Sequence, residues 1–176
     1  SGHFLTALWR IDPESAIFAG KYDNAAILTI PDSASRTQQL EFIDNWLGRL
    51  AKIDTGQLSA RQRTDQALLA NKLNSDRWYL STLREFEWNP AAYNIAGPIE
   101  RILNTEYAAK PQRLRTLLKR IANVPGFYNA ARASIVNPTR EHTQLAVAQG
   151  PGVQTGLAEP DRPRPAATLA PAEKHR

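Results

Sequence analysis

The sequence predicts an all-α protein, an antiparallel hairpin of two long helices with four or five shorter helices packed on it. The first observation is a stretch, residues 32–53, in which apolar residues recur at helical spacing. The second is a stretch, residues 60–87, that contains neither Gly nor Pro. The third is the short turn between them, because two long helices joined so tightly must run antiparallel.

Composition limits the classes of protein to which the chain can belong. Its 176 residues are enough for one domain with a core, and 42% of them are hydrophobic. It contains no apolar run of transmembrane length and no Cys, which excludes disulfides, thiolate metal sites and a Cys nucleophile. Its net charge is +5 with both signs interspersed, which argues against nucleic acid as a partner.

Short elements precede the hairpin. Residues 4–10 are expected to form an apolar turn or short helix. A second helix should begin after Asp12, its N-cap, with Pro13 in the first turn, and should stop at Gly20. Residues 25–30 are apolar enough for a short strand, but we expect an ordered loop there.

The first long helix is expected over residues 32–53, with Asp32 or Ser33 as its N-cap. Its apolar residues fall into a core stripe and a second stripe beside it. The core stripe holds Leu40, Ile43, Leu47 and Leu50, and the second holds Phe42, Trp46 and Ile53.

The second long helix is expected over residues 60–87. Ser59 is its N-cap, and it should stop near Asn89-Pro90, because the residue before a proline avoids the helical region. Its wide apolar face predicts neighbours on more than one side, and Trp46 and Trp78 are expected in the core. The stripe and its flank consist of Leu69, Leu73, Leu80 and Leu83, with Leu68, Tyr79 and Phe86 beside them.

Prolines mark the starts of the remaining helices. These starts are Gly97-Pro98, Lys110-Pro111 and Val124-Pro125, and a last segment should run from Arg140 to about Gln149. The inward residues predicted for the two middle helices are Leu114, Leu117, Leu118 and Ile121, then Phe127, Tyr128, Ala131 and Ile135. We therefore divide the chain into a helical domain, residues 4–150, and a Pro/Ala/Arg-rich tail, residues 151–176, which should be disordered.

Residue types that carry out hydrolysis are few and scattered. A zinc hydrolase typically places two imidazoles on one helix face, as in His-Glu-x-x-His, but His3, His142 and His175 are far apart in the chain. The sequence contains neither a Gly-x-Ser-x-Gly elbow nor a Gly-rich phosphate loop. We assign no catalytic residue and no metal ligand in this chain, and interpret His142 as a surface or helix-packing residue.

Two groups of residues are candidates for binding. At the bend after the second long helix, Trp88, Asn89 and Tyr93 are interpreted as a cleft wall, with simple packing as the alternative for Trp88. The second group is basic, and a solvated outer face explains it more simply than contact with an anionic partner. It consists of Lys110, Arg113, Arg115, Lys119 and Arg120.

Several separated pieces of the sequence together resemble one family. They are Asp12-Pro13-Glu14 with Ala16 and Gly20; Leu50-Ala51-Lys52-Ile53-Asp54; Leu58-Ser59 with Arg63 and Asp65; Trp88-Asn89-Pro90 with Tyr93; Arg113, Arg120-Ile121 and Val124-Pro125; and Ala131-Arg132, Asn137-Pro138-Thr139, His142-Thr143 and Gln149. Their order and spacing resemble the N-terminal part of the domain-of-unknown-function 885 family, bacterial proteins that include lipoproteins and uncharacterised hydrolases. The Pro/Ala/Arg-rich end of the chain departs from that pattern.

The resemblance implies a helical fold like that of the gluzincin-type zinc metallopeptidases. In such proteins a His-Glu-x-x-His helix and a downstream Glu hold zinc, and both lie C-terminal to the matched region, so no ligand maps onto this chain. The chain would then be a lid or cleft wall without its own cofactor, inactive alone, whose partners are a peptide substrate or the missing C-terminal half. The alternative is a free-standing helical module that binds a protein or peptide and associates with itself. An exported, periplasmic or cytoplasmic location stays open.

Overall fold

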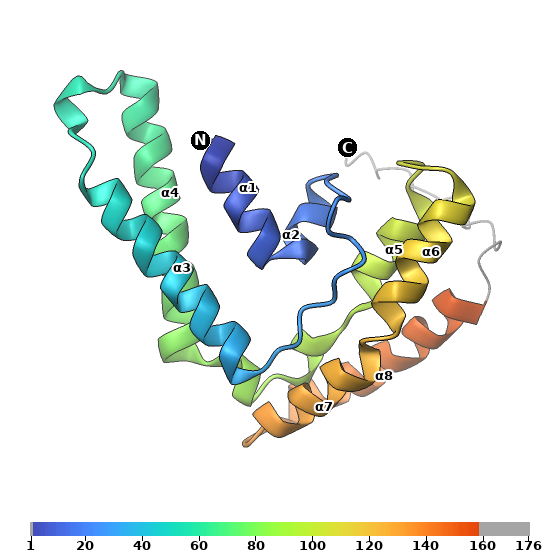
Figure 1. Cartoon of the computed structure of the whole chain (residues 1–176). Helices are drawn as coiled ribbons and strands as arrows, with labels where there is room; N and C mark the ends of the chain where they lie inside the picture. Colours follow the sequence, from blue (N-terminus) through green and yellow to red (C-terminus); the bar gives the residue numbers. More distant parts are fainter. Residues whose placement is uncertain (1, 159–176) are drawn as a thin grey trace, which may run out of the picture.

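The structure is a computed structural model that describes residues 2–158. Its regular structure in this range is entirely helical, which confirms the predicted fold class. Figure 1 shows a V, with α3 (Ser33–Ala51) and α4 (Ala60–Trp78) as one arm and α1 (Gly2–Ile11) and α2 (Pro13–Phe18) lying between the arms. The other arm consists of α5 (Ala96–Asn104), α6 (Lys110–Ile121), α7 (Val124–Ser134) and α8 (Arg140–Ala158).

The C-terminal boundary differs from the expected one in a single respect. Helix α8 continues past residue 150, where we placed the end of the helical domain, and reaches Ala158. The rest of the predicted disordered tail, residues 159–176, lies outside the described residues. Among the helices of residues 2–158, none combines the length and the apolar composition needed to cross a bilayer.

The predicted helix starts are confirmed, and side-chain hydrogen bonds explain those of α2, α3 and α4. The Asp12 carboxylate accepts from the Ser15 N–H at 3.0 Å, and Asp32 caps α3 in the same way. Ser59 and Gln62 form a reciprocal capping box at the start of α4. Each of these bonds spans three residues, so the residue types near each start are enough to predict it.

The end of the second long helix was predicted wrongly. Helix α4 ends at Trp78, and a π-helical turn, Tyr79–Leu83, follows it. Arg84 then adopts the left-handed conformation, with φ 50° and ψ 47°, which ends the helix five residues before Asn89-Pro90. The Trp88 indole N–H donates to the Leu83 carbonyl oxygen at 3.0 Å and so satisfies one of the acceptors that the break exposes.

The core has two parts, one for each arm. Phe4, Ile43, Leu50 and Leu73 form the core of the hairpin arm, where α1 packs on α3 and α4. The Phe4 and Trp46 rings meet edge to face, with 5.0 Å between their centres. The larger core joins α2 and the following loop to the other arm, through Ile17, Ala25, Leu28, Tyr93, Ile95, Ile99, Ile102, Leu117, Phe127 and Ala131.

Several residues predicted to be buried are exposed. Trp78, expected in the core, is 48% exposed, and Leu68 is 63% exposed. The part of α4 that packs on α3 and α1 is centred on Leu73, and neither Leu68 nor Trp78 belongs to that core. On the other arm, Leu114, Leu118 and Tyr128 are also exposed, although Leu117 and Phe127 beside them are buried.

The loop between α2 and α3 is ordered, as predicted, and it is held by a buried arginine. Ala25 and Leu28 are buried in the larger core. Arg120, which we placed on a solvated face of α6, is 1% exposed, and its Nη1 donates to the carbonyl oxygens of Ala25 (3.2 Å) and Ile27. Arg120 is buried because α6 is turned so that Arg120 and Leu117 both pack against this loop.

Candidate functional site

A cavity of about 340 Å³ lies where the two arms meet, bordered by residues from α2, α3, α5, α6 and α7 and from the segment that follows α4. We call it the junction cavity. Its polar lining residues are Glu14, Thr29, Gln39, Glu85, Asn94 and Arg120. Its apolar and aromatic lining residues are Pro31, Tyr79, Leu80, Phe86, Ala92, Tyr93, Ile95, Pro98 and Phe127.

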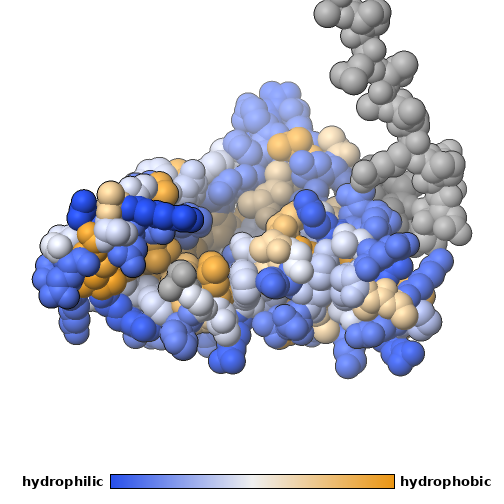
Figure 2. Space-filling view, turned by 90° about the horizontal axis from the view of Figure 1, so that it is seen from above, coloured by the Kyte–Doolittle hydropathy of each residue, from blue (hydrophilic) through white to orange (hydrophobic). Residues whose placement is uncertain are grey.

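A second cavity, of about 360 Å³, adjoins the junction cavity beneath α1. Both cavities are lined by Gln39, Tyr79 and Leu80, so they meet at the π-helical turn. The second cavity is mostly apolar, with Phe4 and Leu73 among its walls. Viewed from above, apolar residues gather on the hairpin arm and deep in the middle of the molecule, with polar residues around them (Figure 2).

An ion pair between a buried arginine and a partly exposed carboxylate forms one wall of the junction cavity. Arg120 donates from Nη2 to the Glu14 carboxylate, whose side chain is 33% exposed. The Arg120 Nε–H is buried and has no hydrogen-bond partner among the described residues. Burial raises the pKa of Glu14, and the charge of Arg120 and its hydrogen bond act in the opposite direction without reversing the effect.

Of the three residues predicted as a cleft wall, Tyr93 lines the junction cavity. Its hydroxyl donates to the Phe86 carbonyl oxygen at 2.8 Å, and burial raises its pKa. Asn89 is buried beside the cavity, where its side chain caps the turn Pro90–Tyr93 and donates to Glu85 Oε1 at 2.6 Å.

Trp88 is turned to the α8 side of the bend. Its ring meets that of His142 edge to face, with 5.0 Å between their centres. His142 Nδ1 also lies 2.6 Å from the Thr139 hydroxyl oxygen, so this imidazole packs on Trp88 and bonds to the residue just before α8. The structure therefore brings Tyr93 into the junction cavity, with Asn89 behind it and Trp88 outside its lining.

Sequence reasoning assigned neither Glu14 nor Glu85 to a site, and it placed Arg120 on a solvated outer face. The available signal was weak: Arg120 follows Leu117 by three residues, the spacing of a shared helix face, and Glu14 was named only within the segment Asp12-Pro13-Glu14. Of the predicted basic group, Lys110, Arg115 and Lys119 are exposed, whereas Arg113 is half-buried and donates to the Leu103 carbonyl oxygen. The five residues therefore do not share one face.

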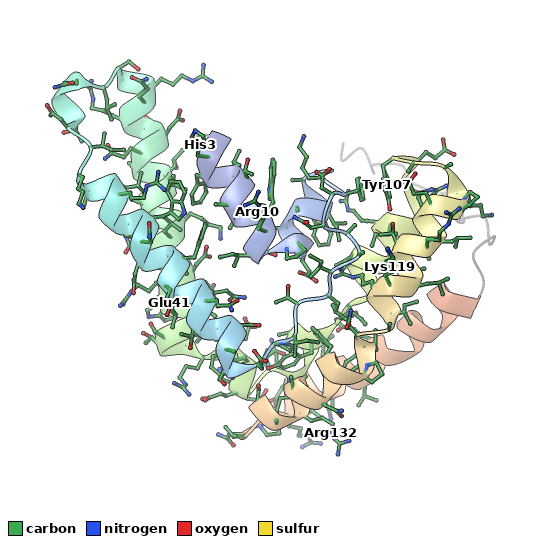
Figure 3. All side chains as sticks on the ribbon, in the orientation of Figure 1. His3, Arg10, Glu41, Tyr107, Lys119 and Arg132 are labelled. Atoms are coloured by element: carbon green, nitrogen blue, oxygen red, sulfur yellow. The ribbon has the colours of Figure 1, made fainter. Side chains whose placement is uncertain are left out.

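The described histidines are not placed to share a metal. His3 lies at the start of α1 (Figure 3), and His142 packs on Trp88 at α8. Across residues 2–158, the structure brings together no group of three His, Asp or Glu side chains able to hold a metal ion. His175 lies outside the described part of the chain.

Comparison with known proteins places the chain in a family. Residues 13–176 match the model of a family described as "Bacterial protein of unknown function (DUF885)". A solved structure described as "a putative lipoprotein of unknown function from Shewanella oneidensis" is 36% identical, with a TM-score of 0.84. The match covers 86% of this chain and 28% of that one, so the chain spans less than a third of that protein's length. No curated protein matches. Since the family model covers most of its residues, the chain belongs to the DUF885 family of bacterial proteins of unknown function.

Proposed function

We propose that this chain acts as the N-terminal wall, or lid, of the substrate cleft in a larger zinc-metallopeptidase-like protein, and is inactive alone. One observation carries the proposal: two adjoining cavities meet at the junction of the arms in a chain that matches 28% of a longer solved relative. Cavities of this size, lined mainly by apolar groups with a few polar ones, are typical of ligand sites.

The π-helical turn between the cavities gives the proposal further support. Such turns occur frequently at functional sites, because one extra residue per turn redirects side chains. Here the turn carries Tyr79 and Leu80, which line both cavities. In a cleft wall these two side chains would contact a peptide and exclude water from it.

The proposal assigns no zinc ligand to this chain, because residues 2–158 bring no three His, Asp or Glu side chains together. In the proposed larger protein, zinc would polarise the scissile carbonyl and activate water from a part outside this module. The lipoprotein description of the solved relative also supports an exported location for this chain.

Metal analysis and a peptide footprint test the proposal. The purified chain should contain far less than one zinc per molecule and should cleave no peptide in a mixed fluorogenic library. A peptide pool added at high concentration should slow hydrogen exchange around residues 79–95. Stoichiometric zinc at a protein site, or protection confined to the α8 side, would rule out an inactive cleft wall.

A free-standing, self-associating module is the second candidate, and the exposed apolar residues of the hairpin arm favour it. Leu68 and Trp78, both on α4, are about half exposed or more. If this part of α4 pairs with a second copy, light scattering should show the apparent mass rising with concentration, and Leu68→Lys should abolish the rise. Leu118→Lys, on the other arm, is the control. A strict monomer at the highest concentration would remove this candidate.

A further inference from the structure

We propose that the junction cavity binds an ammonium group carried on a short apolar stem, the chemistry of a lysine side chain or a free alkylamine. The site is built entirely from described residues of this chain. Binding of an ammonium group at this site goes beyond the peptidase-like proposal, and it does not depend on whether the family cleaves peptides.

The charges that line the cavity favour a cation. The charged residues that line the cavity are two carboxylates, Glu14 and Glu85, and one guanidinium, Arg120, so the lining carries a net negative charge. Arg120 already pairs with Glu14 and with two loop carbonyls. Glu85 accepts a hydrogen bond from the neutral amide of Asn89, and none of the ion pairs within residues 2–158 includes it. A partly enclosed carboxylate without a cationic partner is stabilised by an ammonium ion.

The aromatic rings that line the cavity also attract cations, in addition to the carboxylates. Tyr79, Tyr93 and Phe127 line the cavity, and the face of an aromatic ring attracts cations. One ring of the lining, Phe86, already contacts a cation: the guanidinium carbon of Arg36, a residue outside the lining, lies 4.2 Å from its centre. Carboxylates and aromatic rings together select an ammonium ion over a neutral group of the same size.

The adjoining cavity accounts for the apolar stem. An ammonium group near Glu85 would leave its methylenes beside Tyr79 and Leu80, the side chains through which the two cavities meet. Beyond them the lining is mostly apolar, so methylene groups would be buried against carbon.

A carboxylate ligand is disfavoured in the same place. It would have to lie beside Glu14 and Glu85, and the like charges would repel it. The buried Nε–H of Arg120 is a single donor against two carboxylates, so it does not reverse the preference. The cavity should therefore discriminate between ligands by charge.

Binding of three small probes to the full chain tests the inference. n-Butylammonium, n-butanol and butanoate have similar stems and differ in the charge of the head group. Titration followed by NMR should show saturable binding of n-butylammonium, at least about tenfold tighter than that of the other two. N-acetyl-lysine methylamide separates the two sources of the ligand: binding as tight as that of n-butylammonium points to a peptide lysine, and much weaker binding points to a free amine.

Variants locate the binding. Glu85→Gln keeps the acceptor used by Asn89, so it should fold normally and weaken n-butylammonium binding about fivefold or more. Glu41→Gln removes the same charge from an exposed position on α3 (Figure 3) and should leave binding unchanged. Tyr79→Leu, at an exposed ring, should weaken binding without unfolding the protein. Butanoate binding as tightly as n-butylammonium, no saturable binding of n-butylammonium, or an unchanged affinity in Glu85→Gln would overturn the inference.

Discussion

Replacing Glu14 by Gln tests how the buried guanidinium of Arg120 is stabilised. The substitution keeps a side chain of nearly the same shape and an oxygen that can accept a hydrogen bond. It removes the charge that faces Arg120, which is 1% exposed and otherwise donates to the carbonyls of Ala25 and Ile27.

Two effects of this substitution oppose each other. A neutral Gln avoids the desolvation that raises the pKa of Glu14, whereas Arg120 keeps a buried charge without its carboxylate. Removing one partner of a fully buried pair costs about 3–5 kcal/mol, but Glu14 is one-third exposed, so water can replace part of the interaction. We therefore expect Glu14→Gln to lower the free energy of unfolding by roughly 2 kcal/mol, a large share of a typical domain's stability.

Arg120→Met should cost more, because it also leaves the Ala25 and Ile27 carbonyls without this donor, at about 1–3 kcal/mol for the buried Ala25 acceptor and less for the part-buried Ile27 acceptor. The free energy of unfolding of the double variant should be close to that of Arg120→Met alone, because with Gln at position 14 neither side chain carries an unpaired charge. Urea unfolding followed by circular dichroism measures the stability of the two single variants and of the double variant. Asp44→Asn, in an ion pair whose two side chains are more than half exposed, is the control. The reasoning is refuted if Glu14→Gln costs no more than the control, or if the two substitutions add.

Three further predictions concern packing and capping. Ile102→Ala, at a fully buried position on α5, should cost about 2–5 kcal/mol in urea unfolding, and Leu68→Ala on the exposed face of α4 should change little. Ser59→Ala removes half of the capping box and should cost about 1 kcal/mol, with helix content recovered in Ser59→Asp. The Ser35 N–H lowers the pKa of Asp32 below 3.8, so this carboxylate contributes stability above that pH and loses it as the pH falls through the folded pKa. Unfolding at about pH 6 and about pH 3 should therefore show wild type losing more stability than Asp32→Asn, and equal losses would contradict this assignment.

The parts of the fold that are readable from the sequence are those fixed by neighbouring residues. Asp12, Asp32 and Ser59 cap helices through bonds to backbone three residues away, so residue type and position suffice. The end of α4 depends instead on the left-handed conformation of Arg84 and on the position of Trp88, which bonds to the Leu83 carbonyl and packs on His142 of α8.

Burial was the least predictable property. Helical spacing shows which residues share a stripe, but not how much of that stripe a neighbour covers, and so Trp78 and Leu118 were misplaced. The residues of the junction cavity were equally hard to predict, because most of them meet only in the folded chain. The bend indicated Tyr93, but the partnership of Glu14 with Arg120 joins residues 106 positions apart.

That separation has a consequence for how the protein folds. The hairpin arm is made of neighbouring segments, so we expect it to form early, while its residues are still leaving the ribosome. The loop that contains Ala25 cannot take its final position until Arg120 has been synthesised, because Arg120 supplies the bonds that hold it. We expect α2 and this loop to stay open during most of translation and to close late, when α6 is added.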